Sequence, residues 1–180
     1  MELDELADTL YSVAPADFVS TRDDLVNLAR AEGNKELATR LRALRRPTQV
    51  AWLVNQLVRR RPDLVDELLA VGARFRGAEL TRRDMTELSG RRRALLRDLV
   101  VAARQLAGEA GTALTDDKAR EVEATFGAAA ADEDAAARVR QGRLTTALEY
   151  AGFGPQLQLV PSPEPDRPAA RPGGPSRRDG

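Results

Sequence analysis

Apolar residues recur every three or four positions over most of this chain, the spacing that places them on one face of an α-helix. Gly, Pro, Asn, Thr and Asp stand between the apolar runs, as is typical of helix ends. The pattern of turn residues expected between β-strands is missing. The pattern therefore predicts an all-α, multi-helix fold. The predicted helices cover residues 2–12, 15–33, 34–46, 47–60, 63–76, 81–108, 116–130 and 132–150.

Several of these boundaries have a physical cause that is visible in the sequence. Pro47 and Pro62 each separate two helices, because proline lacks an N–H group and restricts the residue before it. Gly33 is typical of a helix end, and Asn34 is expected to cap the next helix. Two further expected N-caps are Thr115 and Asp132.

The longest predicted helix, 81–108, carries a heptad-like apolar seam. Its positions are Met85, Leu88, Arg92, Leu95, Leu99, Ala102 and Leu106. A seam of this kind packs against other helices, either inside one domain or in a second copy of the chain. The pattern therefore predicts the spine of the domain and leaves self-association as an alternative.

The composition changes abruptly after Gly154. Residues 155–180 are rich in Pro, Gly, Ser and Arg and show no apolar periodicity, a composition that buries too little apolar surface to fold. We therefore expect one helical domain over residues 1–154 and a disordered C-terminal tail over residues 155–180.

The 180 residues include no Cys and no His. Disulfides, Cys/His zinc sites and Cys or His nucleophile–base pairs are thereby excluded. A phosphate-binding glycine loop is also missing from the sequence. We expect a non-enzymatic protein without cofactor or metal. The enzymatic alternative is a Mg²⁺ site among the carboxylates Asp116, Asp117, Glu121, Glu123, Asp132, Glu133 and Asp134.

The beginning of the chain, MELDELADTL, is acidic and lacks the basic and apolar segments of a signal peptide. Nowhere do about 18 apolar residues follow one another, as a membrane-spanning helix requires. These features predict a cytoplasmic protein that does not contact a membrane.

Charge is sorted along the chain although it sums to zero. Residues 35–104 carry 17 Lys and Arg against 8 Asp and Glu, whereas residues 1–34 and 105–154 are net acidic. A basic middle between acidic flanks either recruits a polyanion or is covered by the flanks of the same chain.

The helix predicted over residues 47–60 has polar residues opposite its apolar stripe. At 100° per residue, the polar side carries Thr48, Trp52, Asn55 and Arg59. Trp beside Arg and Asn is typical of a protein-binding hot spot, so these four residues are the candidates for partner binding. The alternative is a helix buried on both sides, with the only Trp of the chain in a second core layer.

A stripe of arginines follows the outer face of the longest predicted helix. The candidates for phosphate contact are Arg82, Arg93, Arg97 and Arg104. Arginine forms bidentate pairs with phosphate oxygens, so the stripe is a hypothetical site for nucleic acid. The alternative is that acidic residues of the flanks pair with these cations.

The Arg-Pro-Thr turn at Arg46, Pro47 and Thr48 leads into an Ala-Trp-x-x-Asn helix with Trp52 and Asn55. In this combination, residues 15–154 resemble a widespread family of uncharacterised helical proteins in high-GC bacteria. The resemblance implies one helical domain ending near Gly154. It implies no substrate, cofactor or partner.

The sequence therefore predicts a cytosolic interaction or adaptor protein of unknown process. Its partner is another protein or a second copy of the chain. The alternative is a nucleic-acid-associated protein that binds phosphates through the Arg-rich middle segment.

Overall fold

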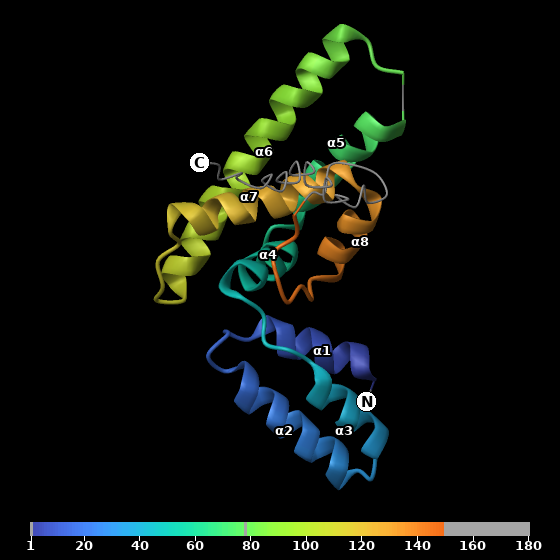
Figure 1. Cartoon of the computed structure of the whole chain (residues 1–180), viewed down its shortest axis with the longest axis vertical. Helices are drawn as coiled ribbons and strands as arrows, with labels where there is room; N and C mark the ends of the chain where they lie inside the picture. The colour runs from blue at the N-terminus through green and yellow to red at the C-terminus, as the bar shows by residue number, and fades with distance from the viewer. Residues whose placement is uncertain (1, 78, 150–180) are drawn as a thin grey trace, which may run out of the picture. The chain divides into compact units, whose positions relative to one another are not determined.

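The computed structural model describes residues 2–77 and 79–149, and the regular structure of these residues consists of helices without strands (Figure 1). The all-α prediction is confirmed. The predicted domain end at residue 154 and the predicted disordered tail lie outside the described residues. The described helices are α1 (Leu3–Ser12), α2 (Phe18–Ala31), α3 (Lys35–Ala43), α4 (Gln49–Arg60), α5 (Pro62–Gly77), α6 (Arg82–Glu109), α7 (Asp116–Ala131) and α8 (Glu133–Gln141).

The helix ends follow the chemistry expected from the sequence. Asn34, Thr115 and Asp132 each cap a helix, because a side-chain oxygen accepts a hydrogen bond from the backbone N–H three residues later. Thr81 and Asp84 form a reciprocal capping box at the beginning of α6. These side chains satisfy backbone donors that have no partner inside the helix.

The turn between α2 and α3 is set by two adjacent residues. Gly33 has a φ of +77°, a left-handed conformation that costs glycine little, and its N–H donates to the carbonyl of Arg30 at 2.9 Å. The Asn34 N–H donates to the carbonyl of Ala29 at 2.9 Å. This pair of bonds is the Schellman arrangement, which ends α2 sharply and returns the chain as α3.

The first three helices enclose apolar clusters of their own, and we call them the N-terminal bundle. One cluster includes Val26, Leu37 and Leu41, and a second includes Leu10 and Phe18. Helices α4 to α8 surround the largest cluster, and we call them the main bundle. A non-helical segment, residues 44–48, joins the two bundles.

The seam of α6 packs inside the main bundle. Leu88, Leu95, Leu99 and Leu106 are buried, and α6 contacts α4, α5 and α7. The seam therefore forms the predicted spine, and its buried apolar residues are not available to a second copy of the chain. Met85, at the beginning of the seam, is exposed.

Three helix boundaries differ from the prediction, and one of them is the end of α3, which lies at Ala43 rather than at Arg46. Helix α2 begins at Phe18 rather than near Pro15, after a turn in which the Asp17 N–H donates to the carbonyl of Ala14 at 3.0 Å. Helix α8 ends at Gln141, where Gly142 adopts a φ of +62°, and residues 143–149 are not helical. The prediction of helical turns as far as Leu148 was therefore wrong, because the backbone of this segment is hydrogen-bonded to other helices. Tyr150 lies outside the described residues.

Helix α7 crosses α5 at very close range (Figure 1). Gly72 of α5 is buried, and a Cβ atom placed on it would overlap the backbone carbonyl of Ala130 in α7. Only glycine therefore fits at this crossing, and the neighbouring residues of α7, Ala128 and Ala129, are also small and buried.

Replacing Gly72 by Ala is expected to lower the free energy of unfolding by about 1–3 kcal/mol, the usual cost of overpacking. The matched control is Gly90→Ala in α6, where an added Cβ meets nothing within 4 Å. That control is expected to raise stability by about 0.5–1 kcal/mol, because alanine loses less backbone entropy than glycine. Urea unfolding followed by circular dichroism measures both changes, and equal shifts in the two variants would contradict the close crossing.

Candidate functional site: the polar face of helix α4

Helix α4 is buried on nearly all sides. Residues 50–57 are all buried, Trp52 retains 7% of its accessible surface and Asn55 none. The apolar stripe faces the core of the main bundle, and the polar side contacts α1 and the segment after α8. This side is therefore not a free surface in the structure, its packing agrees with the alternative of a helix buried on both sides, and its role in partner binding stays a prediction.

The end of α1 is held by two side chains of α4. The Trp52 indole N–H donates to the carbonyl of Val13 at 2.8 Å, and the Gln56 amide donates to the carbonyls of Tyr11 and Ser12 at 3.3 and 3.1 Å. The last carbonyls of a helix have no partner within it and carry its partial negative charge. Helix α4 therefore recognises the C-terminal end of α1 through side-chain donors.

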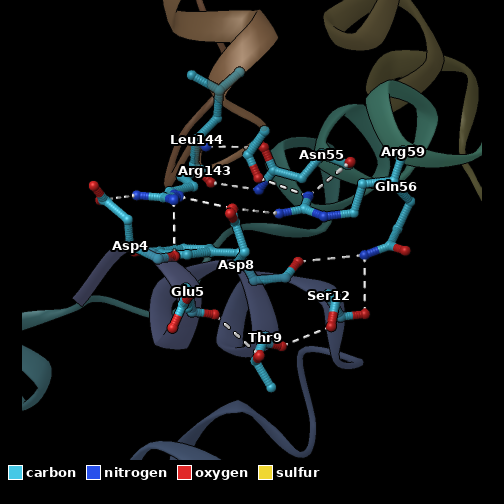
Figure 2. A network of polar contacts seen from close by, with 12 residues as sticks. Asp4, Glu5, Asp8, Thr9, Ser12, Asn55, Gln56, Arg59, Arg143 and Leu144 are labelled. Carbon is cyan, nitrogen blue, oxygen red and sulfur yellow. Dashed lines mark hydrogen bonds and ion pairs between the residues drawn. The ribbon is translucent and has the colours of Figure 1, made fainter. Parts of the chain in front are cut away.

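Two arginines converge on the acidic side of α1, as Figure 2 shows. Arg143 donates to a carboxylate oxygen of Asp4 at 2.6 Å, to the Asp4 carbonyl at 2.8 Å and to Asp8 at 2.9 Å. Arg59 donates to the carbonyls of Asn55 and Gly142 at 2.9 and 2.8 Å, and lies 3.5 Å from the Asp8 carboxylate. We call Asp4, Asp8, Arg59 and Arg143 the α1 latch.

The charges of the α1 latch shift the ionisation of its members. The hydrogen bond from Arg143 lowers the pKa of Asp8, and the bond to Asp8 raises the pKa of Arg143 above its usual value. Burial lowers the pKa of Arg59. Because 56% of the Asp8 side chain remains exposed, solvent screens the latch and each pair contributes no more than about 1 kcal/mol.

The polar side of α4 also holds the chain after α8. The Asn55 amide donates to the Leu144 carbonyl at 2.9 Å, and its oxygen accepts from the Leu144 N–H at 2.8 Å. The Thr48 N–H donates to the Thr145 carbonyl at 2.9 Å. In α7, the buried hydroxyl of Thr125 accepts from the Leu148 N–H at 3.1 Å. Side chains of α4 and α7 thus supply hydrogen-bond partners for the backbone of the non-helical segment after α8.

The four predicted partner-binding residues have three different roles in the structure. Thr48 is exposed and caps α4 by accepting from the Ala51 N–H at 3.2 Å. Trp52 and Asn55 are interior residues that bind backbone, and Arg59 belongs to the α1 latch. The partners of the face therefore come from the chain itself.

Sequence reasoning did not identify the other members of this site. These residues are Asp4, Asp8, Gln56, Thr125 and Arg143. The available signals were the acidic first helix and the position of Gln56 one turn after Trp52. No local pattern links either signal to Arg143, which follows the last helix of the described residues.

The predicted phosphate-contact residues are not equivalent. Arg82, Arg93 and Arg97 are exposed and form no ion pair within residues 2–77 and 79–149. Arg93 and Arg97, together with Gly90 and Glu123, line a hollow of ≈ 440 Å³ between α6 and α7. Arg104 instead pairs with Asp116 at 2.7 Å and donates to the Leu114 carbonyl at 3.0 Å.

Acidic residues of the two flanks cover part of the basic middle, as the alternative interpretation predicted. The pairs are Arg59 with Asp8, Arg60 with Glu109, Arg76 with Glu133 and Arg104 with Asp116. Four cations of the middle segment thus form ion pairs with acidic residues of the flanks. Other cations of this segment have no acidic partner among the described residues.

The residues that the structure describes contain no group of three acidic side chains placed to hold a metal ion. They also contain no helix that is long and apolar enough to span a membrane. Comparison with known protein families, with curated proteins and with solved structures finds no match. The resemblance to the high-GC bacterial family therefore stays a prediction.

Replacing Asp8 by Asn tests the α1 latch through its pH dependence. The pKa of folded Asp8 lies below the ordinary value of 3.8, so its ionised form stabilises the fold at higher pH and this contribution is lost as the pH falls through the lowered pKa. We expect the wild-type chain to be more stable than the variant by up to about 1 kcal/mol above about pH 5. The difference should vanish in strong acid.

Urea unfolding between about pH 2 and about pH 7, a range that spans the ordinary pKa of Asp, measures this difference. Asp24→Asn in α2 is the control, because it removes an exposed carboxylate that has no ion pair among the described residues. An advantage of the wild-type chain that grows toward acid pH would contradict the latch.

Proposed function

We propose that this chain is a non-enzymatic, cytosolic interaction protein whose docking surface is the Trp52, Gln56 and Arg59 side of α4. In the structure, the chain's own helix α1 occupies this surface. A partner helix with the same chemistry would compete with α1: acidic residues along one side and free carbonyls at its C-terminal end. A second copy of the chain carries such a helix.

The observation that carries the proposal is the recognition of a helix end. Trp52 and Gln56 donate to three successive carbonyls, those of Tyr11, Ser12 and Val13. Trp is the residue most typical of interaction hot spots, because it combines a large apolar area with one directed donor.

The chemistry of the contact supports exchange of α1 for a partner. The N-terminal bundle keeps its own apolar clusters, and the segment 44–48 joins it to the main bundle. The α1 latch is polar and half-exposed, so salt and competing charges weaken it. When the interface between two parts of one chain is polar, as it is in the α1 latch, the two parts are expected to move relative to one another.

A labelled peptide of residues 2–16 tests this proposal on the full chain. In the wild-type chain the tethered α1 has a millimolar effective concentration and should exclude the peptide. We expect Asp4→Lys/Asp8→Lys, which reverses the charges facing Arg59 and Arg143, to raise peptide affinity at least about tenfold in fluorescence anisotropy.

The matched control is Glu2→Lys/Glu5→Lys, because these exposed acids belong to the same stretch and do not contact Arg59 or Arg143. Peptide binding to this control should equal that of the wild-type chain. Equal affinity for all three chains, or no binding to any, would rule out a displaceable α1.

A second candidate function is the binding of nucleic acid by the outer face of α6. Arg93 and Arg97 favour it, because they lie one helical turn apart at the same hollow and have no ion pair within the described residues. The carboxylate of Glu123 also lines the hollow and reduces its positive charge. Contacts to phosphate groups through this face would be independent of base sequence.

A salt titration against a random duplex tests the second candidate. Each phosphate contact steepens the log–log dependence of the binding constant on salt by about 0.9, so Arg93→Gln/Arg97→Gln should reduce the slope by about 2. The control, Arg83→Gln/Arg120→Gln, removes two exposed cations that already pair with Glu87 and Asp117, and should leave the slope nearly unchanged. Absence of binding at about 50 mM salt would eliminate this function.

A further inference from the structure

The hairpin of α2 and α3 contains a hollow that neither function uses. It has a volume of ≈ 620 Å³ and is lined by Arg30, Lys35, Ala38, Thr39 and Arg42. Arg30 comes from the last turn of α2, and the other four residues occupy one side of α3. The Schellman turn at Gly33 and Asn34 ends α2 beside the start of α3 and so brings Arg30 and Lys35 to the same hollow.

The hollow is strongly cationic. Arg30, Lys35 and Arg42 are exposed, and none of them forms an ion pair with another residue in the described part of the chain. The nearest acids in the sequence, Glu32 and Glu36, do not line the hollow. The site therefore differs from the hollow on α6, where Glu123 accompanies two arginines.

Lys35 stands at an electrostatically unfavourable position. It is the first residue of α3, where the partial positive charge of the helix end favours Asp or Glu and opposes a cation. Arg42, in the last turn of the same helix, is favourably placed. A cation at the positive end of a helix, with no acidic side chain paired to it, departs from the usual charge pattern of helices. Such departures are typical of functional positions.

The donors of this site are the three cationic side chains. The Thr39 hydroxyl donates to the Lys35 carbonyl at 2.9 Å, so its hydrogen is used within the helix. Ala38 is buried and gives the hollow an apolar floor. A ligand must therefore offer several anionic oxygens and needs few donors of its own.

The extent of the site exceeds one phosphate group. Lys35 and Arg42 are seven residues apart on α3, which corresponds to about 10 Å along the helix axis. Several linked phosphates match this length, and the guanidinium groups of Arg30 and Arg42 are suited to bidentate pairs with phosphate oxygens. The volume lies in the range typical of small-ligand pockets, which favours a small soluble ligand over a flat polymer interface.

We infer that the α2–α3 hollow is a binding site for a small oligophosphate, held by Arg30, Lys35 and Arg42. The site lies outside the α1 latch and the α6 stripe, so the inference does not rest on either proposed function.

Calorimetric titration of the full chain with inorganic tripolyphosphate tests this inference. We expect saturable binding at about 20 mM salt that weakens as salt is added. Arg30→Gln/Lys35→Gln/Arg42→Gln should reduce the affinity at least about tenfold. The control, Arg83→Gln/Arg120→Gln/Arg138→Gln, removes the same charge from exposed positions outside the hollow and should change the affinity less than about twofold.

Three outcomes would overturn the inference. The first is no saturable binding by the wild-type chain, and the second is an equal loss in both triple variants, which would show an effect of net charge only. The third is binding of a duplex through Arg30, Lys35 and Arg42 without binding of tripolyphosphate, which would show a nucleic-acid surface instead. Because the replaced side chains are exposed, thermal unfolding should show that both variants remain folded.

Discussion

The structure depends on the pairing of non-helical backbone by side chains of α4. Two segments cross this helix: the end of α1, whose last carbonyls have no partner within the helix, and the non-helical chain after α8. Asn55 supplies both bonds to Leu144, Gln56 binds the last two carbonyls of α1, and Trp52 binds the carbonyl that follows it. A buried backbone group without a partner costs about 1–3 kcal/mol, so these contacts decide where the two segments lie.

This constraint explains why α4 is polar on one side although it is buried. The three buried polar side chains among the described residues are Asn55, Gln56 and Thr125, and each of them binds backbone of another segment. An apolar replacement would fill the same volume but leave the crossing segments unsatisfied. The polar side of α4 thus connects the N-terminal bundle, the main bundle and the last described segment.

The sorting of charge along the sequence has a different consequence. Pairs such as Arg143 with Asp4 and Arg60 with Glu109 join the basic middle or the last segment to acidic flanks. Exposed pairs contribute little free energy, so the pairs of the α1 latch orient α1 rather than hold the fold together. Five of the cations that have no ion pair among the described residues line two hollows of different chemistry, one with Glu123 on α6 and one without any carboxylate between α2 and α3. The polar side of α4 and these two hollows are the three places where we propose binding.

The sequence by itself determined the helices, their order and most of their ends. Helix ends are set by interactions between residues that are close together in the sequence, and such interactions can be predicted from the sequence pattern. The examples are Gly33, Asn34, Thr115 and Asp132. The seam of α6 was predicted for the same reason, because its period follows from the geometry of one helix. The sequence also left two alternatives for α4, exposed or buried on its polar side, and it did not choose between them.

Only the tertiary structure made that choice, because the deciding contacts join residues far apart in the chain. Asn55 and Leu144 are 89 positions apart, and Arg143 and Asp4 are 139 apart, so no periodicity relates them. The backbone carbonyl of Ala130 in α7 leaves no room for a Cβ atom at position 72, so this position must be glycine. The sequence around Gly72 does not indicate that another helix crosses there. The exposure of a polar side chain is set by what packs against it, and in this chain that is decided by how α1, α7 and the segment after α8 meet α4.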